Sequence, residues 1–77
     1  MNKARRKSLQ DIADRISELQ LLLSAVADEE RDTADNMPEN LQSSEKVEQM
    51  NENADDMESA ASDLEDIYNT LQDIISR

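Results

Sequence analysis

The sequence contains no cysteine, histidine, glycine, phenylalanine or tryptophan, and it has one proline and one tyrosine. Without cysteine or histidine, this chain of 77 residues has neither the disulfides nor the usual zinc ligands with which small domains reinforce a small core. The Ser–His and Cys–His pairs of common nucleophilic enzymes are excluded as well. We therefore expect no enzyme, no cofactor and no metal, and we expect a homodimer to supply the missing core.

The sequence also lacks a long apolar run. No uninterrupted run exceeds three apolar residues, whereas a membrane-spanning helix needs about 18. The absence of cysteine fits a reducing compartment. We expect a soluble, unprocessed cytoplasmic protein that does not bind a membrane.

Positive charge is scarce and unevenly placed. The chain has 8 basic and 19 acidic residues, a net charge of −11. Residues 1–27 hold five basic and three acidic residues, net +2, whereas residues 28–77 hold three basic and sixteen acidic residues, net −13. An acidic surface of this strength repels nucleic acid and anionic lipid and attracts basic partners.

The apolar residues that are present repeat at helical spacing. Steps of three and four residues, which mark the face of a helix that packs along a partner helix, run through both halves of the chain. We call the residues on this face the seam. The predicted seam of the first half is Leu9, Ile12, Ile16, Leu19, Leu23 and Val26. That of the second half is Val47, Met50, Ala54, Met57, Ala61, Leu64, Tyr68, Leu71 and Ile75. The pattern predicts two helices, over about residues 3–35 and 44–76.

The stretch DNMPENLQSSEK holds the single proline and predicts the corner between the helices, at about residues 36–43. Proline breaks an established helix but fits a first turn, so MPENLQ is expected to form a short helical turn. Asn36 is its expected N-cap, with Glu39 completing a capping box. Ser43 and Ser44 offer a cap for the second helix.

A short corner between long helices favours an antiparallel hairpin. We expect one all-α domain over residues 1–77, with Leu23 level with Met57 and Leu9 level with Leu71. Apolar residues beside the seam are more than one partner helix can cover, which predicts that two hairpins pair into a four-helix bundle. The expected oligomer interface consists of Leu21, Leu22, Ala60, Ile67 and Ile74.

The acidic residues of the second helix fall outside the seam, and basic residues that could pair with them at i,i+4 are nearly absent. One interpretation is that these carboxylates, although they repel one another, create a negative electrostatic field that binds a basic protein surface, as nucleic-acid phosphates do. The alternative is that the acid only keeps a small bundle soluble. The candidate partner-binding residues are Asp28, Glu29, Asp32, Asp35, Glu48, Glu52, Asp55, Asp56, Asp63 and Asp66.

Two further stretches have simpler interpretations. DEERDTAD is rich in oxygen ligands but lacks the glycine and the alternating spacing of an EF-hand loop. KARRK is basic, but no aromatic residue accompanies it for base stacking, and Glu65, Asp66 and Asp73 are expected to neutralise it. We therefore expect neither a dedicated metal site nor direct binding of nucleic acid.

The start MNKARRK, the corner PENLQ followed by Ser44 and Glu45, and the acidic second helix together resemble a group of small helical proteins of phages and prophages of Gram-positive bacteria. The resemblance covers nearly the whole chain. It implies a compact accessory protein of a mobile element, acting in the cytoplasm of a bacterial host cell. By analogy with small acidic phage proteins that inhibit host defence nucleases, such as anti-CRISPR proteins, it further implies an inhibitor.

The residues support two functional hypotheses. In the first, the chain is a non-enzymatic, stoichiometric inhibitor whose acidic helical face blocks a basic nucleic-acid-binding surface of a host protein. In the second, it is a structural or assembly protein that docks another helix through the apolar residues beside the seam. Binding through the acidic face should weaken steeply with salt, whereas apolar docking should hardly change.

Overall fold

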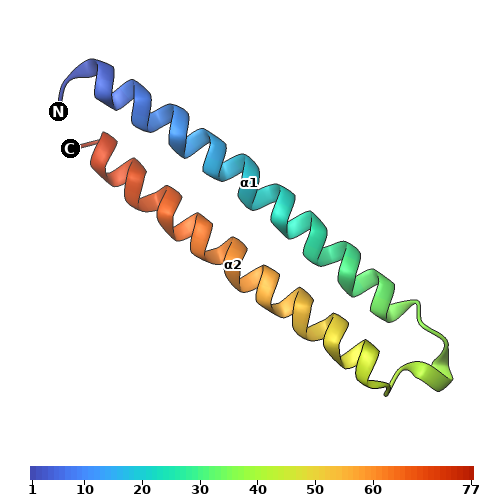
Figure 1. The fold of residues 1–77 in the computed structure, drawn as a ribbon. Coiled ribbons are helices and arrows are strands. Elements are labelled where there is room, and N and C mark those ends of the chain that lie inside the picture. The colour runs from blue at the N-terminus through green and yellow to red at the C-terminus, as the bar shows by residue number, and fades with distance from the viewer.

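The protein is a hairpin of two long helices in a computed structural model that describes residues 1–77. The elements are α1 (Lys3–Asp35), a short 3-10 helix η1 (Glu39–Leu41) and α2 (Glu45–Ile75). The long helices lie side by side in opposite directions, so both termini are at one end of a rod of 60 × 14 × 12 Å (Figure 1). The predicted all-α antiparallel hairpin is confirmed, and both helices match their predicted bounds within one residue.

Neither helix contains an apolar stretch long enough to cross a membrane.

Each long helix begins at a side-chain cap. Asn2 precedes α1, and its Oδ1 accepts a hydrogen bond from the Arg5 backbone N–H at 2.8 Å. Ser44 precedes α2, and its Oγ accepts one from the Val47 backbone N–H at 3.3 Å. Each cap satisfies an amide that has no partner inside its helix. Of the two serines predicted as caps of α2, Ser44 fills that role.

The corner contains the predicted short turn, η1, but its predicted N-cap was wrong. Asn36 is the C-cap of α1, and its backbone N–H donates to the Asp32 carbonyl at 3.0 Å. The residue that precedes η1 is Pro38, which makes no side-chain capping bond. Because α1 continues as far as Asp35, Asn36 is still held in the hydrogen-bond pattern of that helix and does not start the next one.

The end of α1 is closed by a side chain from beyond η1. Gln42 Nε2 donates to the Met37 carbonyl at 2.6 Å and to the Ala34 carbonyl at 3.2 Å. The Ala34 carbonyl also accepts a hydrogen bond from the Met37 backbone N–H at 3.3 Å, so Gln42 adds to this bond and ties the residues after α1 to its last turn. The sequence did not indicate this role, because Gln42 reaches these carbonyls only after the chain has turned.

Alanines form most of the fully buried contact between the helices. The six buried residues, each at most 3% exposed, are Ala13, Ala27, Ala34, Val47, Ala54 and Ala61. Small side chains let two helix backbones approach closely, and half-buried Leu, Ile and Met side chains then fill the space between the alanines. All nine predicted seam residues of α2 are buried or half-buried, so that prediction is confirmed.

Only three of the six predicted seam residues of α1 lie on the face that meets α2. Ile12, Leu19 and Val26 are 49%, 55% and 47% exposed, so they are not seam residues. The face that meets α2 consists of Leu9, Ala13, Ile16, Gln20, Leu23, Ala27, Glu30 and Ala34. Hydrophobicity alone favours isoleucine and leucine over alanine for burial. Here the close contact of two alanine rows determines which face turns inward, and the larger side chains are left at its edge.

Side-chain hydrogen bonds between the helices show how α1 and α2 are aligned along the rod. Arg6 Nη2 donates to the Arg77 carbonyl at 3.0 Å, and Asn53 Nδ2 donates to Glu30 Oε2 at 3.4 Å. Arg6 and Glu30 are 24 residues apart, as are Asn53 and Arg77. Taken alone, these two contacts set Leu23 level with residue 60, whereas Arg31 reaches further along the rod to Asp55 and Glu58. The alignment therefore agrees with the expected level of Leu23 and Met57 to within about one helical turn. The register depends on the path of the corner, which the helical pattern does not specify.

Ala27→Leu is expected to destabilise the hairpin by about 1–3 kcal/mol, because a larger side chain at a fully buried position forces the backbones apart. Ala25→Leu, on the exposed side of α1, is the matched control and should change stability by less than about 0.5 kcal/mol. Urea unfolding followed by circular dichroism at one protein concentration measures both. Equal stabilities of the two variants would contradict a tight alanine contact.

Candidate functional site

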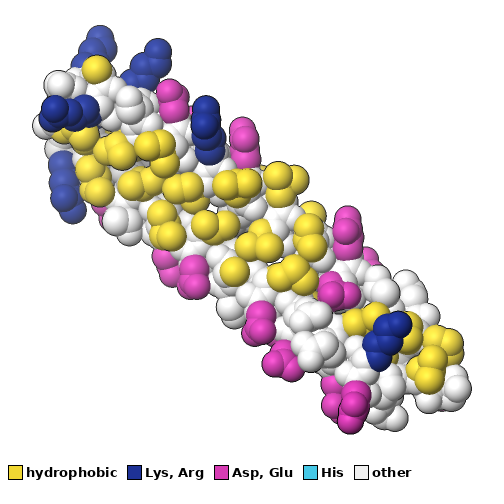
Figure 2. Space-filling model, in the orientation of Figure 1, with side chains coloured by type: hydrophobic (Ala, Val, Ile, Leu, Met, Phe, Trp, Pro, Cys, Tyr) yellow, Lys and Arg dark blue, Asp and Glu magenta, His cyan; other side chains and the backbone are white.

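An apolar surface runs along one side of the hairpin. It consists of two rows with seven-residue spacing, one on each helix, directly beside the seam. We call it the apolar flank, and its residues are Ile12, Leu19, Val26, Ala60, Ile67 and Ile74. Each flank residue comes directly before a seam residue; Ile12, for example, precedes Ala13, and Ala60 precedes Ala61. In an antiparallel pair of helices, residues at this position of the two helices lie on the same side of the pair. Figure 2 shows this face, where hydrophobic side chains form a continuous band across both helices from the end with the termini past the middle of the rod.

The apolar flank includes three of the five residues predicted for the oligomer interface, namely Ala60, Ile67 and Ile74. Leu22 borders it, because three residues along an α-helix turn the side chain by only about 60° from Leu19. Leu21 lies about 160° from Leu19, on the other side of α1. The α1 row of the flank was not recognised from the sequence, because its residues also fit the spacing of the seam.

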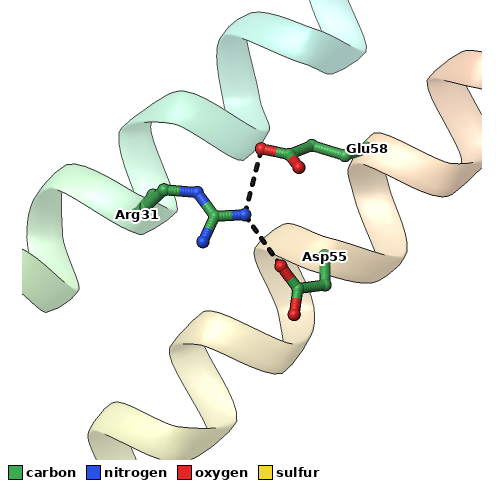
Figure 3. A network of polar contacts seen from close by, with 3 residues as sticks. All are labelled: Arg31, Asp55 and Glu58. Carbon is green, nitrogen blue, oxygen red and sulfur yellow. Dashed lines mark hydrogen bonds and ion pairs between the residues drawn. The ribbon is translucent and has the colours of Figure 1, made fainter.

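The opposite side of the hairpin carries ion pairs between the helices. Arg31 Nη2 donates to Asp55 Oδ1 at 2.9 Å and to Glu58 Oε1 at 3.0 Å (Figure 3). The Arg31 side chain is 35% exposed, so water reaches the contact and weakens the attraction. No role was predicted for Arg31 from the sequence, although it is the only basic residue between Arg15 and Lys46.

The pKa of Arg31 is raised above its ordinary value, first by the hydrogen bond to Asp55 and then by the one to Glu58. A basic group whose pKa is raised on folding stabilises the fold fully below its unfolded value, and this contribution is lost only as the pH rises through the folded value. Both values lie far above neutrality. The arginine side of this contact therefore does not titrate in the physiological range.

The ten predicted partner-binding carboxylates are all exposed. Among them, only Asp55 forms an ion pair, with Arg31. No three acidic side chains are arranged so that they could hold a metal ion. The single surface depression is shallow and open, and it is lined by Val26, Glu29, Glu30 and Thr33. The carboxylates thus form a spread surface of charge rather than a pocket.

Charge divides the rod into two unlike halves. The terminal half, residues 1–19 and 65–77, has six basic and six acidic residues and no net charge. The corner half, residues 20–64, has two basic and thirteen acidic residues and a net charge of −11. The register of Glu30 with Asn53 sets Leu19 level with Leu64, so this division cuts both helices at the same height.

The charges at the ends of α1 oppose its helix dipole. The N-terminal turns carry the basic segment Lys3–Lys7, and no acidic residue lies in the first turn. The C-terminal turns carry Asp32 and Asp35, and no basic residue lies in the last turn. A helix has partial positive charge at its N-terminus and partial negative charge at its C-terminus. Both arrangements are therefore unfavourable within the isolated helix.

Comparison of the chain with protein-family models, curated proteins and solved structures finds no match.

Arg31→Gln is expected to lower the melting temperature more than Arg15→Gln, which removes the same charge from the terminal half and from a residue without an ion pair. Removing Arg31 leaves Asp55 and Glu58 unpaired among the other acidic residues. The difference between the two variants should shrink at high salt, because salt screens repulsion between exposed charges. Thermal unfolding at low and high sodium chloride concentration measures it, and an equal loss in both variants at low salt would contradict a role for this ion pair.

Proposed function

We propose that the protein is a non-enzymatic binding module whose acidic corner half occupies a basic surface of another protein. The observation that carries the proposal is the separation of charge along the rod, with −11 in the corner half and zero in the terminal half. A field concentrated at one end attracts and orients a basic partner, whereas an acidic surface that only confers solubility has no need of this separation.

The density of charge in the corner half approaches that of a nucleic acid. This half takes up about 30 Å of the 60 Å rod, so it carries roughly one net negative charge per 3 Å, against one per about 1.7 Å in a DNA duplex. The carboxylates are held by two packed helices, so little conformational entropy is lost when they bind. A basic surface suited to phosphates would therefore attract this end of the rod.

The form of the proposal that we favour is a stoichiometric inhibitor. A rod that occupies a basic channel excludes the nucleic acid that normally binds there, and it needs no catalytic group to do so. The resemblance of the start, the corner and the acidic helix to small phage and prophage proteins supports a partner among the nucleic-acid-binding defence proteins of a bacterial host. The protein would act in the cytoplasm of that host cell.

The apolar flank supports a second candidate function, a role in assembly. Four large apolar side chains of the flank, Ile12, Leu19, Val26 and Ile67, are 47–55% exposed on one side of the rod. If docking through this flank were the function, the acidic side chains would only keep the protein soluble. Binding of the partner would then be lost on Ile67→Asp and would survive neutralisation of the corner half.

The test uses two matched variants that each lose four negative charges. The corner variant carries Asp28→Asn, Asp32→Asn, Glu52→Gln and Asp56→Asn. The control variant carries Asp11→Asn, Asp14→Asn, Glu65→Gln and Asp73→Asn in the terminal half. All eight residues are exposed and none forms an ion pair, so the fold should be retained in both. Proteins retained from a Gram-positive bacterial lysate are identified by mass spectrometry, and their affinities are then measured with purified components.

The corner variant is expected to bind the retained partner at least about 10-fold more weakly than the unmodified protein, and the control variant within about 3-fold of it. Binding should also weaken with salt and should be displaced by duplex DNA. Equal losses in the two variants, or binding that neither salt nor DNA affects, would contradict the proposal.

A further inference from the structure

We propose that two copies of the chain form an antiparallel dimer through the apolar flank, with a twofold axis at the height of Leu19. The inference goes beyond the proposed function and does not depend on it. It rests on three features of the described residues. These are the symmetry of the flank, the distribution of charge along the rod, and the charges at the two ends of α1.

The apolar flank of α1 is symmetric about Leu19. Ile12 and Val26 lie seven residues on either side of it. A twofold axis perpendicular to the rod at this height would set Leu19 against Leu19 of the second copy. The same operation would set Ile12 against Val26 of the second copy, so each large apolar side chain of this row meets another.

The row on α2 is compatible with the same axis. The register places Leu64 level with Leu19, and Ala60 and Ile67 lie almost equally far from residue 64 on either side. The operation therefore sets Ile67 against Ala60 of the second copy, a large residue against a small one. A single axis thus pairs the central residues of both rows, as a self-complementary interface requires.

The charge distribution selects the antiparallel arrangement over the parallel one. A parallel dimer would place two corner halves side by side, each with a net charge of −11. An antiparallel dimer places each corner half beside the terminal half of the other copy, which has no net charge. Like charges brought together across an interface oppose association, and the antiparallel arrangement avoids this.

The ends of α1 are complementary to each other in this arrangement. The axis at Leu19 brings the basic segment Lys3–Lys7 to the height of residues 31–35 of the second copy, which include Asp32 and Asp35. Within a single helix these charges oppose the dipole. On the flank itself Arg5 faces Thr33 of the second copy, and the other charged residues of the two segments, including Arg31, lie at matching heights on other sides of the helix. The basic start of each copy therefore lies level with the acidic end of the other, as a match of net charge and not of direct ion pairs.

Two rods that overlap along their whole length present a face as large as a standard interface. The rod measures 60 by 14 Å across its backbone, and each partner in a standard interface buries roughly 800 Å². An axis at Leu19, in the middle of α1, gives this full overlap. The apolar band runs from the end with the termini past the middle of this face, and charged side chains border it along both long edges (Figure 2). A buried apolar centre with a polar rim is the usual anatomy of a specific interface.

The first test compares two leucines of α1 that are similarly exposed, Leu19 at 55% and Leu21 at 65%. Leu19 lies at the proposed axis and Leu21 lies on the other side of the helix. The unmodified chain is expected to sediment at twice its mass of 8.7 kDa at micromolar concentrations. Leu19→Asp should weaken the dimer by at least about 100-fold, because it buries two facing carboxylates. Leu21→Asp should leave it within about 3-fold. A monomeric unmodified chain, or equal effects of the two variants, would overturn the proposal.

The second test leaves the apolar flank untouched, so it holds even if Leu19→Asp unfolds. The chain has no cysteine, and both Arg5 and Thr33 are exposed at positions that the axis brings together. A mixture of Arg5→Cys and Thr33→Cys chains is expected to form mixed disulfide dimers on mild oxidation, several-fold more than either variant alone. A parallel dimer keeps these two cysteines at opposite ends of the rod. Failure of the mixed pair to form in excess would overturn the antiparallel arrangement.

Discussion

The close contact between the alanine rows of α1 and α2 is the interaction on which the rest of the molecule depends. Ala13, Ala27, Ala34, Ala54 and Ala61 are almost completely buried, and their small size allows the two backbones to lie against each other. Once this contact is made, the larger seam residues can only fill the space beside it. The rows of isoleucine, leucine and valine next to the seam are then left at the edge of the pair. The tight contact within the hairpin is thus the reason that a large apolar surface remains outside it.

A thin rod of this kind cannot bury much surface by itself. A small core contributes only a few kcal/mol, and the repulsion among thirteen acidic residues in the corner half works against folding. Both features are consistent with a chain whose stability is completed by association. The apolar flank is suited to a second copy, and the acidic corner half is suited to a basic partner. The apolar flank occupies one side of the rod, and the ten candidate carboxylates lie on its other sides, so one surface does not exclude the other.

Charge has a different meaning at each level of structure in this protein. Within α1, the basic start and the acidic end oppose the helix dipole. Within the hairpin, a single arginine, Arg31, links the helices through Asp55 and Glu58. In the proposed antiparallel dimer, the basic start of each α1 lies level with the acidic end of the other copy, so charges that are unfavourable locally have opposite charges at the same height. A pattern that lowers the stability of one helix is therefore informative about contacts outside it.

The sequence alone determined the helices, their bounds and the position of the corner, because helical spacing, the single proline and the capping serine are local signals. It also determined the uneven charge and the exposure of the ten candidate partner-binding carboxylates, which follow from composition and spacing. Tertiary structure decided which face of α1 turns inward, the register of the pair, and the roles of Arg31 and Gln42. Two overlapping faces of α1 fit the same heptad spacing, and hydrophobicity favoured the one with larger side chains. Only the closeness of the two backbones, a property of the pair and not of either helix, selects the alanine face.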